Sequence, residues 1–336
     1  MHKLLASLIA CAMTVAAPAA FAQTNGAQTN AAPTKLEVSF FPGANWVLLI
    51  GQNEGFFARE KLDVHFDPVR GSVEQINNMM SGKADLGLTA FDNVIAYDAG
   101  QGSKDVQQPT DLFAFMGGEQ LALQFIASPD IKKIEDMKGK TLAVDASNTG
   151  FAFVLYSALE KHKLKQGDYN ILAVGSSQAR LDAITSGKAQ AAGLNRPFDS
   201  IALSKGAVNL GNMRKLFPHY QASAGFTRRA WAAQHRDTLI AFIRAYVKSS
   251  LWLFDASHKA AAIDLLAKNT QGLSAQQAAD IYRDTAGKGG IGSPTAKMDP
   301  AGIDTVVKLR GQYAEPKKKL NPRDFYDLSY YKAATK

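Results

Sequence analysis

The sequence of 336 residues predicts an α/β protein with two lobes, each built on a mostly parallel sheet beside a ligand cleft, and a helical C-terminal part. Three observations predict this fold class. A nine-residue pattern occurs twice, as INNMMSGKA over 76–84 and as LDAITSGKA over 181–189. Strand-like and helix-like segments alternate up to residue 221, which favours parallel sheets. Beyond that residue the chain has one further strand pattern and is otherwise helical in character.

Both copies of the pattern predict the same unit of loop, helix, glycine stop and buried strand. Each lies downstream of a Gly-Ser pair, Gly71-Ser72 or Gly175-Ser176, and each is followed by Phe-Asp, at Phe91-Asp92 or Phe198-Asp199. Helix, glycine and strand in this order are common in any α/β protein, but four identical consecutive residues at equivalent places favour a repeat. Two such lobes would face each other across a cleft, where ligands bind.

The first lobe is predicted over residues 35–117 and 222–336. Its strands are expected where short runs alternate or are wholly apolar, and its first helix carries Trp46, Leu49 and Ile50 on one side. Ser72 is the expected cap of the next helix and Gly82 its stop. The expected strands are 36–41, 62–69, 86–88, 112–116 and the returning strand 222–227, and the expected helices are 45–59, 72–80, 239–254, 260–268, 275–285 and 301–312.

The second lobe is predicted over residues 118–221 by the same alternation. Its expected strands are 121–127, 140–144 and 170–174, with a short apolar run at 190–194, and its expected helices are 151–161 and 178–185.

The N-terminus predicts export. Met1-His2-Lys3, an apolar stretch over 4–20 and Ala20-Phe21-Ala22 form a secretory signal peptide (residues 1–22), so we expect cleavage after Ala22 and a periplasmic protein. The apolar stretch is shorter than the ~20 residues of a spanning helix and Pro18 interrupts it. Residues 23–34, rich in Asn and Thr, predict a disordered linker.

Cysteine content limits the chemistry. Cys11 is the only cysteine, and although residues 8–11 resemble a lipoprotein cleavage box, the apolar residues continue beyond it, so lipidation is not expected. The mature chain would then have no disulfide, thiol catalysis or cysteine-bound metal.

The charge and the motifs of the sequence argue against several classes of function. The net charge of +8 suggests an anionic partner only weakly, and the basic run 317–319 is typical of a solvated surface, so no nucleic-acid partner is expected. The pattern G-x-G-x-x-G occurs at Gly287, Gly289 and Gly292, but it follows a helix and so lacks the strand that precedes a dinucleotide-binding site. The segment Gly139-Lys140-Thr141 resembles the end of a phosphate-binding P-loop but lacks the earlier glycine of that motif. No hydrolase or zinc motif occurs. We therefore expect no catalytic residue, no metal, no cofactor and no enzyme activity.

Five segments in order carry a resemblance to a known family: 55–64, 81–85, 137–144, 196–198 and 242–246. They are similar to periplasmic substrate-binding proteins of ABC importers, of the nitrate, sulfonate and taurine type, which also includes binders of thiamine pyrimidine precursors. The resemblance implies the type II periplasmic-binding-protein fold, a monomer, and permease and ATPase partners at the inner membrane.

One segment departs from the family. Where the family often has Trp-Glu-Pro-Phe, this chain has Asn195-Arg196-Pro197-Phe198. Arg196 would offer paired donors to a carboxylate, sulfonate or phosphonate if it faced the cleft. The alternative is an ion pair with Asp199 at the surface.

Binding residues are expected in the loops at the carboxyl ends of the strands. Ser72, Thr149 and Ser177 open helices, whose free amides favour an anion, although each is also an ordinary cap candidate. Asp92 and Glu119 fit an anion poorly and would suit a ligand amine. The predicted ligand-binding residues are Asn45, Trp46, Gly71, Ser72, Thr89, Phe91, Asp92, Glu119, Asn148, Thr149, Gly150, Ser177, Asn195 and Arg196.

The predicted function is capture of a small organic anion (a sulfonate, a taurine-like compound or a carboxylate) by closure about hinges near Gly118 and Gln221. Three alternatives stay open at this point. The ligand could be a thiamine pyrimidine precursor or another aromatic solute, the chain could be an enzyme related to pyrimidine synthesis, or it could present its ligand to a membrane sensor.

Overall fold

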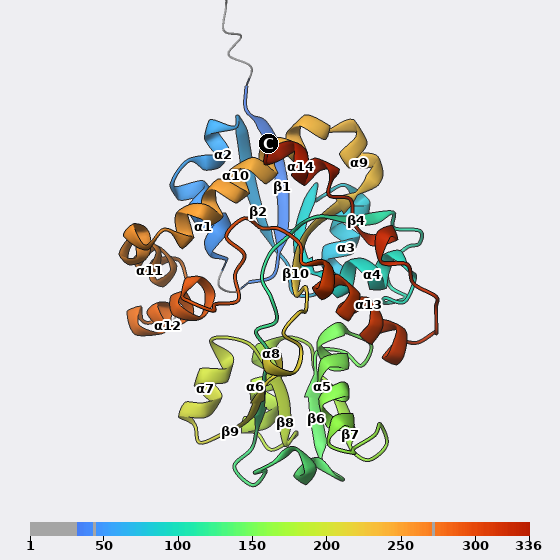
Figure 1. Cartoon of the computed structure of the whole chain (residues 1–336). Coiled ribbons are helices and arrows are strands. Elements are labelled where there is room, and N and C mark those ends of the chain that lie inside the picture. The colour runs from blue at the N-terminus through green and yellow to red at the C-terminus, as the bar shows by residue number, and fades with distance from the viewer. Residues whose placement is uncertain (1–31, 43–44, 271–272) are drawn as a thin grey trace, which may run out of the picture. The chain divides into compact units, whose positions relative to one another are not determined.

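The structure is a computed structural model and describes residues 32–42, 45–270 and 273–336 (Figure 1). The predicted signal peptide with Cys11, and the predicted linker up to residue 31, lie outside the described residues. The first strand begins at Thr34, the last residue of that predicted linker. None of the helices in the described ranges has the length and apolar character needed to span a membrane.

Two five-stranded sheets with the same strand pairing form the framework. In each, two parallel pairings are followed by two antiparallel ones, so four strands run one way and β10 or β5 runs against them. The first sheet has the order β2(Leu62–Pro68), β1(Thr34–Phe40), β3(Leu86–Ala90), β10(Ser223–Arg228), β4(Leu112–Gly117). The second has the order β7(Asn170–Ala173), β6(Thr141–Val144), β8(Ala191–Leu194), β5(Gln124–Ala127), β9(Val208–Asn212). The predicted α/β class with mostly parallel sheets is confirmed.

Helices lie beside both sheets and form the regular structure of the C-terminal part of the chain (Figure 1). Those that follow strands of the first sheet are α1(Trp46–Asn53), α2(Phe56–Arg59), α3(Ser72–Ser81) and α4(Phe91–Asp98). Those of the second sheet are α5(Gly150–Lys161), α6(Ser177–Thr185), α7(Phe198–Ser204) and α8(Met213–Leu216). The C-terminal part contains α9(Arg229–Gln234), α10(Arg236–Phe254), α11(Lys259–Asn269), α12(Ala275–Ala286), α13(Pro300–Tyr313) and α14(Ser329–Ala334), and 3-10 turns lie at Ile134–Met137, Ala256–His258 and Pro322–Phe325.

The repeated sequence pattern forms the same local structure in both sheets. Gly82 and Gly187 follow α3 and α6 with φ angles of 78° and 75°, which only glycine adopts without strain. Two residues later, the amide of Ala84 donates to Asn78 and that of Ala189 to Ala183, both at 3.0 Å. The strands that follow, β3 and β8, occupy the same central position in their sheets. The repeat is therefore a structural duplication.

Several expected elements differ in detail. The helix expected over 45–59 is two helices, because Gly55 at φ 69° interrupts it. Ser72 does not cap α3: Gly71 is the N-cap residue, and the Ser72 hydroxyl lies 2.9 Å from the Tyr97 hydroxyl instead. The short elements α4, α7, α8, α9, α14 and β9 were not predicted, because each is brief or follows its neighbour with no loop between them.

The main chain passes between the sheets through residues 118–123 and 217–222. The two crossings pair with each other through an isolated antiparallel bridge between Gln120 and Gln221. Ala222 and Ser223 also donate their amides to the Glu119 carbonyl, each at 3.2 Å. The predicted hinge positions, Gly118 and Gln221, both lie in these crossings; hinge motion and the lobe boundaries at 117/118 and 221/222 stay predictions.

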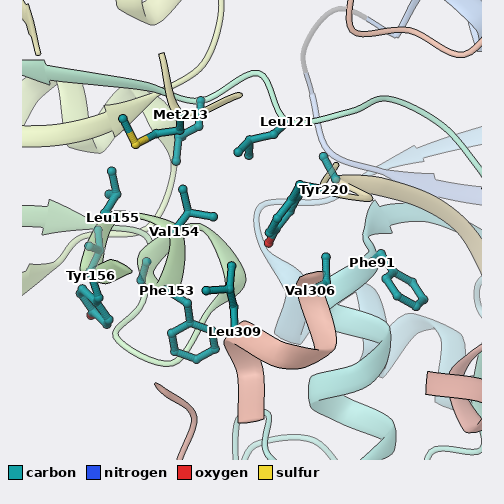
Figure 2. Packing of buried hydrophobic residues seen from close by; sticks show 14 of the residues in the cluster. Phe91, Leu121, Phe153, Val154, Leu155, Tyr156, Met213, Tyr220, Val306 and Leu309 are labelled. Carbon is teal, nitrogen blue, oxygen red and sulfur yellow. The ribbon is translucent and has the colours of Figure 1, made fainter. Parts of the chain in front are cut away.

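The largest buried apolar cluster includes residues from elements of both sheets. Figure 2 shows Phe153 of α5 beside Leu309 of α13, and the cluster continues through Tyr220 of the return crossing to Phe91 of α4. Helix α5 follows a strand of the second sheet, whereas α4 follows a strand of the first. Apolar packing therefore joins the two halves on this side of the molecule.

The glycine stops give a test of the duplicated unit. We expect Gly82→Ala and Gly187→Ala each to lower the free energy of unfolding by about 1 kcal/mol, because a Cβ is strained at these φ angles. At both positions the added Cβ meets nothing within 4 Å, so backbone strain is the only cost. Gly311→Ala in α13 also meets nothing, lies outside the left-handed region and should be neutral or stabilising. Urea unfolding measures all three, and equal losses at all three glycines would contradict this account.

Candidate functional site

A cavity of about 930 Å³ lies at the carboxyl ends of strands from both sheets. This position is the one that open α/β sheets use for ligands. Its wall contains the first residues of α1, α3, α5 and α6, together with the crossing segments around Glu119 and Ala222. Free amides at such helix starts, with the positive end of the helix dipole, favour negatively charged groups.

Most of the predicted binding residues line this cavity. They are Asn45, Trp46, Gly71, Ser72, Thr89, Asp92, Glu119, Thr149, Gly150, Ser177 and Asn195. Their contact with a ligand stays a prediction. Phe91, Asn148 and Arg196 are not part of the cavity wall.

Phe91 and Asn148 have structural contacts instead. Phe91 is the first residue of α4, and its side chain is completely buried in the apolar cluster (Figure 2). The Asn148 amide donates to the carbonyls of Gln101 and Glu315 at 2.9 and 3.0 Å and accepts from the Glu315 amide. Asn148 therefore fastens the loop before α5 to segments outside the second sheet.

Arg196 is occupied by two carboxylates. Its Nη2 lies 2.7 Å from Asp284 of α12, and its Nε lies 3.5 Å from Asp199 in the first turn of α7, the helix that follows Arg196. It also hydrogen-bonds to the Ser200 hydroxyl. Of the two alternatives raised for this residue, the structure shows pairing with Asp199 and adds the partner Asp284.

Asp92 forms a buried ion pair with Arg310 of α13. Arg310 Nε lies 2.7 Å from Asp92 Oδ1 and Nη2 lies 2.5 Å from Oδ2, and the two side chains are 0% and 3% exposed. The Gly150 amide, at the start of α5, donates to the same Oδ2 at 2.7 Å. Both carboxylate oxygens of Asp92 thus have partners within the protein.

Of the three hydroxyl residues considered as helix caps, Ser72, Thr149 and Ser177, only Thr149 caps its helix. Thr149 caps α5 by accepting from the Ala152 amide at 3.3 Å, and its hydroxyl donates to Asp145 at 2.7 Å. Helix α6 is capped by Ser176 and not by Ser177, whose hydroxyl accepts from Arg180 at 2.8 Å. Loop geometry decides which of two adjacent serines is the cap, and the sequence pattern does not specify it.

Two arginines of the wall were not among the predicted residues. Arg180, 4% exposed, donates to the Gly193 carbonyl and lies near Asp145: burial lowers the pKa of Arg180, while Asp145 raises it. Arg70 is exposed, directly precedes Gly71, and its guanidinium has no ion-pair or hydrogen-bond partner among residues 32–42, 45–270 and 273–336. Its position next to a predicted Gly-Ser loop was the signal that could have identified Arg70.

Three buried polar atoms of the wall also lack a hydrogen bond to the described parts of the chain: Trp46 Nε1, Asn195 Oδ1 and the Tyr220 hydroxyl. Buried polar atoms in proteins are nearly always hydrogen-bonded. These three atoms belong to wall residues but are themselves buried, so they are not exposed to the cavity. No group of three His, Cys, Asp or Glu side chains suited to a metal ion occurs in the described ranges.

A family model described as NMT1/THI5 like matches residues 46–260. The alkanesulfonate-binding protein SsuA from Xanthomonas axonopodis pv. citri, solved bound to MOPS, has a TM-score of 0.63 and 18% identity, covering 75% of this chain and 84% of that one.

Two further solved structures are similar. The periplasmic aliphatic sulphonate binding protein SsuA from Escherichia coli has a TM-score of 0.61 and 20% identity, covering 75% of this chain and 83% of that one. The periplasmic nitrate-binding protein NrtA from Synechocystis PCC 6803 has a TM-score of 0.73 and 12% identity, covering 90% and 88%. These likenesses show a periplasmic-binding-protein fold and confirm the resemblance seen in the sequence. No curated protein matches the chain.

The Asp92–Arg310 pair gives a test of what holds this site in place. Arg310→Met should lower the free energy of unfolding by about 3–5 kcal/mol, because it leaves the Asp92 carboxylate buried without its cation. Combining it with Asp92→Asn should recover part of that loss, since the two effects are coupled.

The control is Arg283→Met, which removes a guanidinium 63% exposed and 2.7 Å from Asp280. Its effect should be much smaller, because exposed ion pairs contribute little. If urea unfolding gave Arg310→Met no larger an effect than Arg283→Met, the buried pair would not have the structural role described.

Proposed function

Because the chain belongs to the NMT1/THI5-like family, we propose that it is the periplasmic solute-binding component of an ABC importer and captures a small organic anion in the cavity between its sheets. In this proposal the chain acts as a monomer without catalysing a reaction. It delivers its ligand to a membrane permease that is driven by an ATPase.

Arg70 at the start of α3 is the observation that carries the anion assignment. The helix has no side-chain cap, so the amides of Ser72 and Val73 remain available at the cavity wall. Arg70 adds a guanidinium directly before them, and this guanidinium has no partner in the described ranges, although the Arg70 amide donates to Glu74 Oε2 at 2.9 Å. A guanidinium with helix-start amides suits a carboxylate, sulfonate or phosphonate.

The other wall arginine is less available. Arg180 donates to Gly193 and Ser177 and faces Asp145, so its charge is largely compensated inside the protein. Arg196, the residue favoured from the sequence, is paired with Asp199 and Asp284. We therefore assign the anion-binding role to Arg70.

The rest of the wall supports an organic ligand. Val47, Leu48, Leu253 and Phe254 are among the apolar residues that line the cavity. A cavity of about 930 Å³ is also much larger than a bare inorganic anion needs. The wall also contains aromatic side chains such as Phe254, which could stack on an aromatic ligand. An aromatic solute, such as a thiamine pyrimidine precursor, is therefore the second candidate ligand.

The relatives and the chain path support this proposal. Two of the similar structures are sulfonate binders and one is a nitrate binder, and all of these ligands are anions. In this proposal the two crossings at residues 118–123 and 217–222 would act as the hinge about which the lobes close on the ligand. A closed form is what a permease would recognise.

Thermal shift of the refolded chain from Gln23 onward tests the ligand class. The panel contains sulfonates, carboxylates, nitrate and pyrimidines. A ligand at a hundred times its dissociation constant should stabilise the protein by about 2.7 kcal/mol. We expect sulfonates or carboxylates to raise the melting temperature and Arg70→Gln to weaken their binding roughly 10- to 100-fold, as for a lost charged hydrogen bond.

Arg196→Gln is the contrasting variant, because it removes an arginine that does not line the cavity. It should leave ligand affinity close to that of the wild type. Loss of binding in Arg196→Gln with none in Arg70→Gln would overturn the assignment to Arg70, and a hit only among pyrimidines would replace the anion with the aromatic candidate.

A further inference from the structure

Glu119 lies on the crossing from the first sheet to the second and lines the cavity. Its backbone is fixed: the Ser223 hydroxyl lies 2.6 Å from its amide nitrogen, and its carbonyl accepts from the amides of Ala222 and Ser223. Gly118 packs so closely that an added Cβ would lie 2.3 Å from the Ser223 hydroxyl oxygen. The Glu119 side chain therefore starts from a backbone position that hydrogen bonds to the other crossing hold within the cavity wall.

The Glu119 carboxylate has no partner. No ion pair or side-chain hydrogen bond involves it among residues 32–42, 45–270 and 273–336. The other two acids of the wall differ: Asp92 is paired with Arg310, and Asp145 has Arg180 nearby and accepts from the Thr149 hydroxyl. Glu119 is thus the acid of the described wall whose charge the protein leaves uncompensated.

Burial makes this charge costly. It raises the pKa of Glu119 to about 7, and no neighbouring cation acts against that rise. The neighbouring group is the Tyr246 phenol, another wall residue, whose pKa is raised by burial and by the Glu119 charge. A group bound here gains most if it brings a positive charge, because that charge offsets the desolvated carboxylate.

We propose that Glu119 is a binding subsite for a protonated amine, so that the ligand of this cavity carries an ammonium group in addition to its anionic group. The inference rests on the proposed function for the anionic end, which Arg70 and the start of α3 would hold. The ligand class is then a zwitterion with its two charges separated by an apolar linker.

A metal ion does not fit this position. Metal sites in proteins need several side-chain ligands, and the described residues contain no suitable group of three His, Cys, Asp or Glu. An ammonium needs only hydrogen-bond acceptors. The two oxygens of the Glu119 carboxylate, a residue of the cavity wall, are such acceptors.

The experiment uses matched ligands that differ only in the amine. Dissociation constants are measured by calorimetry for 3-aminopropanesulfonate and propanesulfonate, for 4-aminobutanoate and butanoate, and for 4-(aminomethyl)benzoate and 4-methylbenzoate. Propylamine and benzylamine serve as amines without an anionic group. We expect each zwitterion to bind roughly 10- to 100-fold more tightly than its amine-free partner, the range for a charged hydrogen bond.

Glu119→Gln should abolish that preference, and the amine-free anions should bind at least as tightly as to the wild type, because a like charge is removed from the cavity wall. Glu54→Gln, outside the cavity wall after α1, is the control and should keep the preference. Affinity of the wild type for the zwitterions should rise between pH 6 and pH 8, because Glu119 must be ionised to accept the ammonium. This rise should be absent in Glu119→Gln.

The possible results separate this inference from the proposed function. If amine-free anions bind as tightly as zwitterions, or if Glu119→Gln keeps the preference, the amine subsite is wrong and the anion proposal stands. If propylamine or benzylamine binds as tightly as a zwitterion and through Glu119, the amine subsite stands and the anion proposal is wrong. If no member of the panel binds, both are wrong.

Discussion

The buried pair between Asp92 and Arg310 is the interaction on which the arrangement of the cavity depends. Asp92 lies in α4, beside the first sheet, Arg310 lies in α13, and the Gly150 amide that joins them opens α5 after a strand of the second sheet. Arg310 also donates to the Asn148 carbonyl at 3.1 Å. Three helices from distant parts of the sequence thus meet at two charged side chains that are almost entirely buried.

This junction also determines which charges remain for a ligand. Asp92 takes the first amide of α5, so that helix start is already occupied by an anion of the protein itself. At the start of α3 the Glu74 carboxylate accepts from the Arg70 amide at 2.9 Å, no side chain caps the helix, and the Arg70 guanidinium has no partner among the described residues. Among the wall acids, Asp92 and Asp145 have cations nearby, whereas Glu119 has none. The cavity therefore presents one uncompensated charge of each sign.

The fold could be predicted from the sequence because its signals are local. The Ser-Gly-Lys-Ala repeat contains the helix end, the left-handed glycine and the strand start within a few residues, and both copies form that unit. The site could be predicted only as a set of loops, since strand ends identify where a ligand binds but not which side chains pair with each other. Asp92 and Arg310 are 218 positions apart, and nothing in either segment indicates their contact.

Arg196 and Arg70 illustrate the same limit. Arg196 stood out because it departs from a family pattern, but its partner Asp284 lies in α12, far along the chain. Arg70 lies next to a predicted Gly-Ser loop, but its importance comes from the absence of a partner for its guanidinium among the described residues, which only coordinates reveal. Pairing in space, and not residue type, separates the two arginines.

The central claim is that one small molecule contacts both sheets and the crossing between them. Hydrogen exchange, followed by mass spectrometry with and without the tightest-binding member of the ligand panel, tests it most directly. The account predicts that binding slows exchange together at the start of α3, at the start of α6 and around Glu119. Slower exchange confined to the elements of one sheet, or no change in any of these segments, would contradict it.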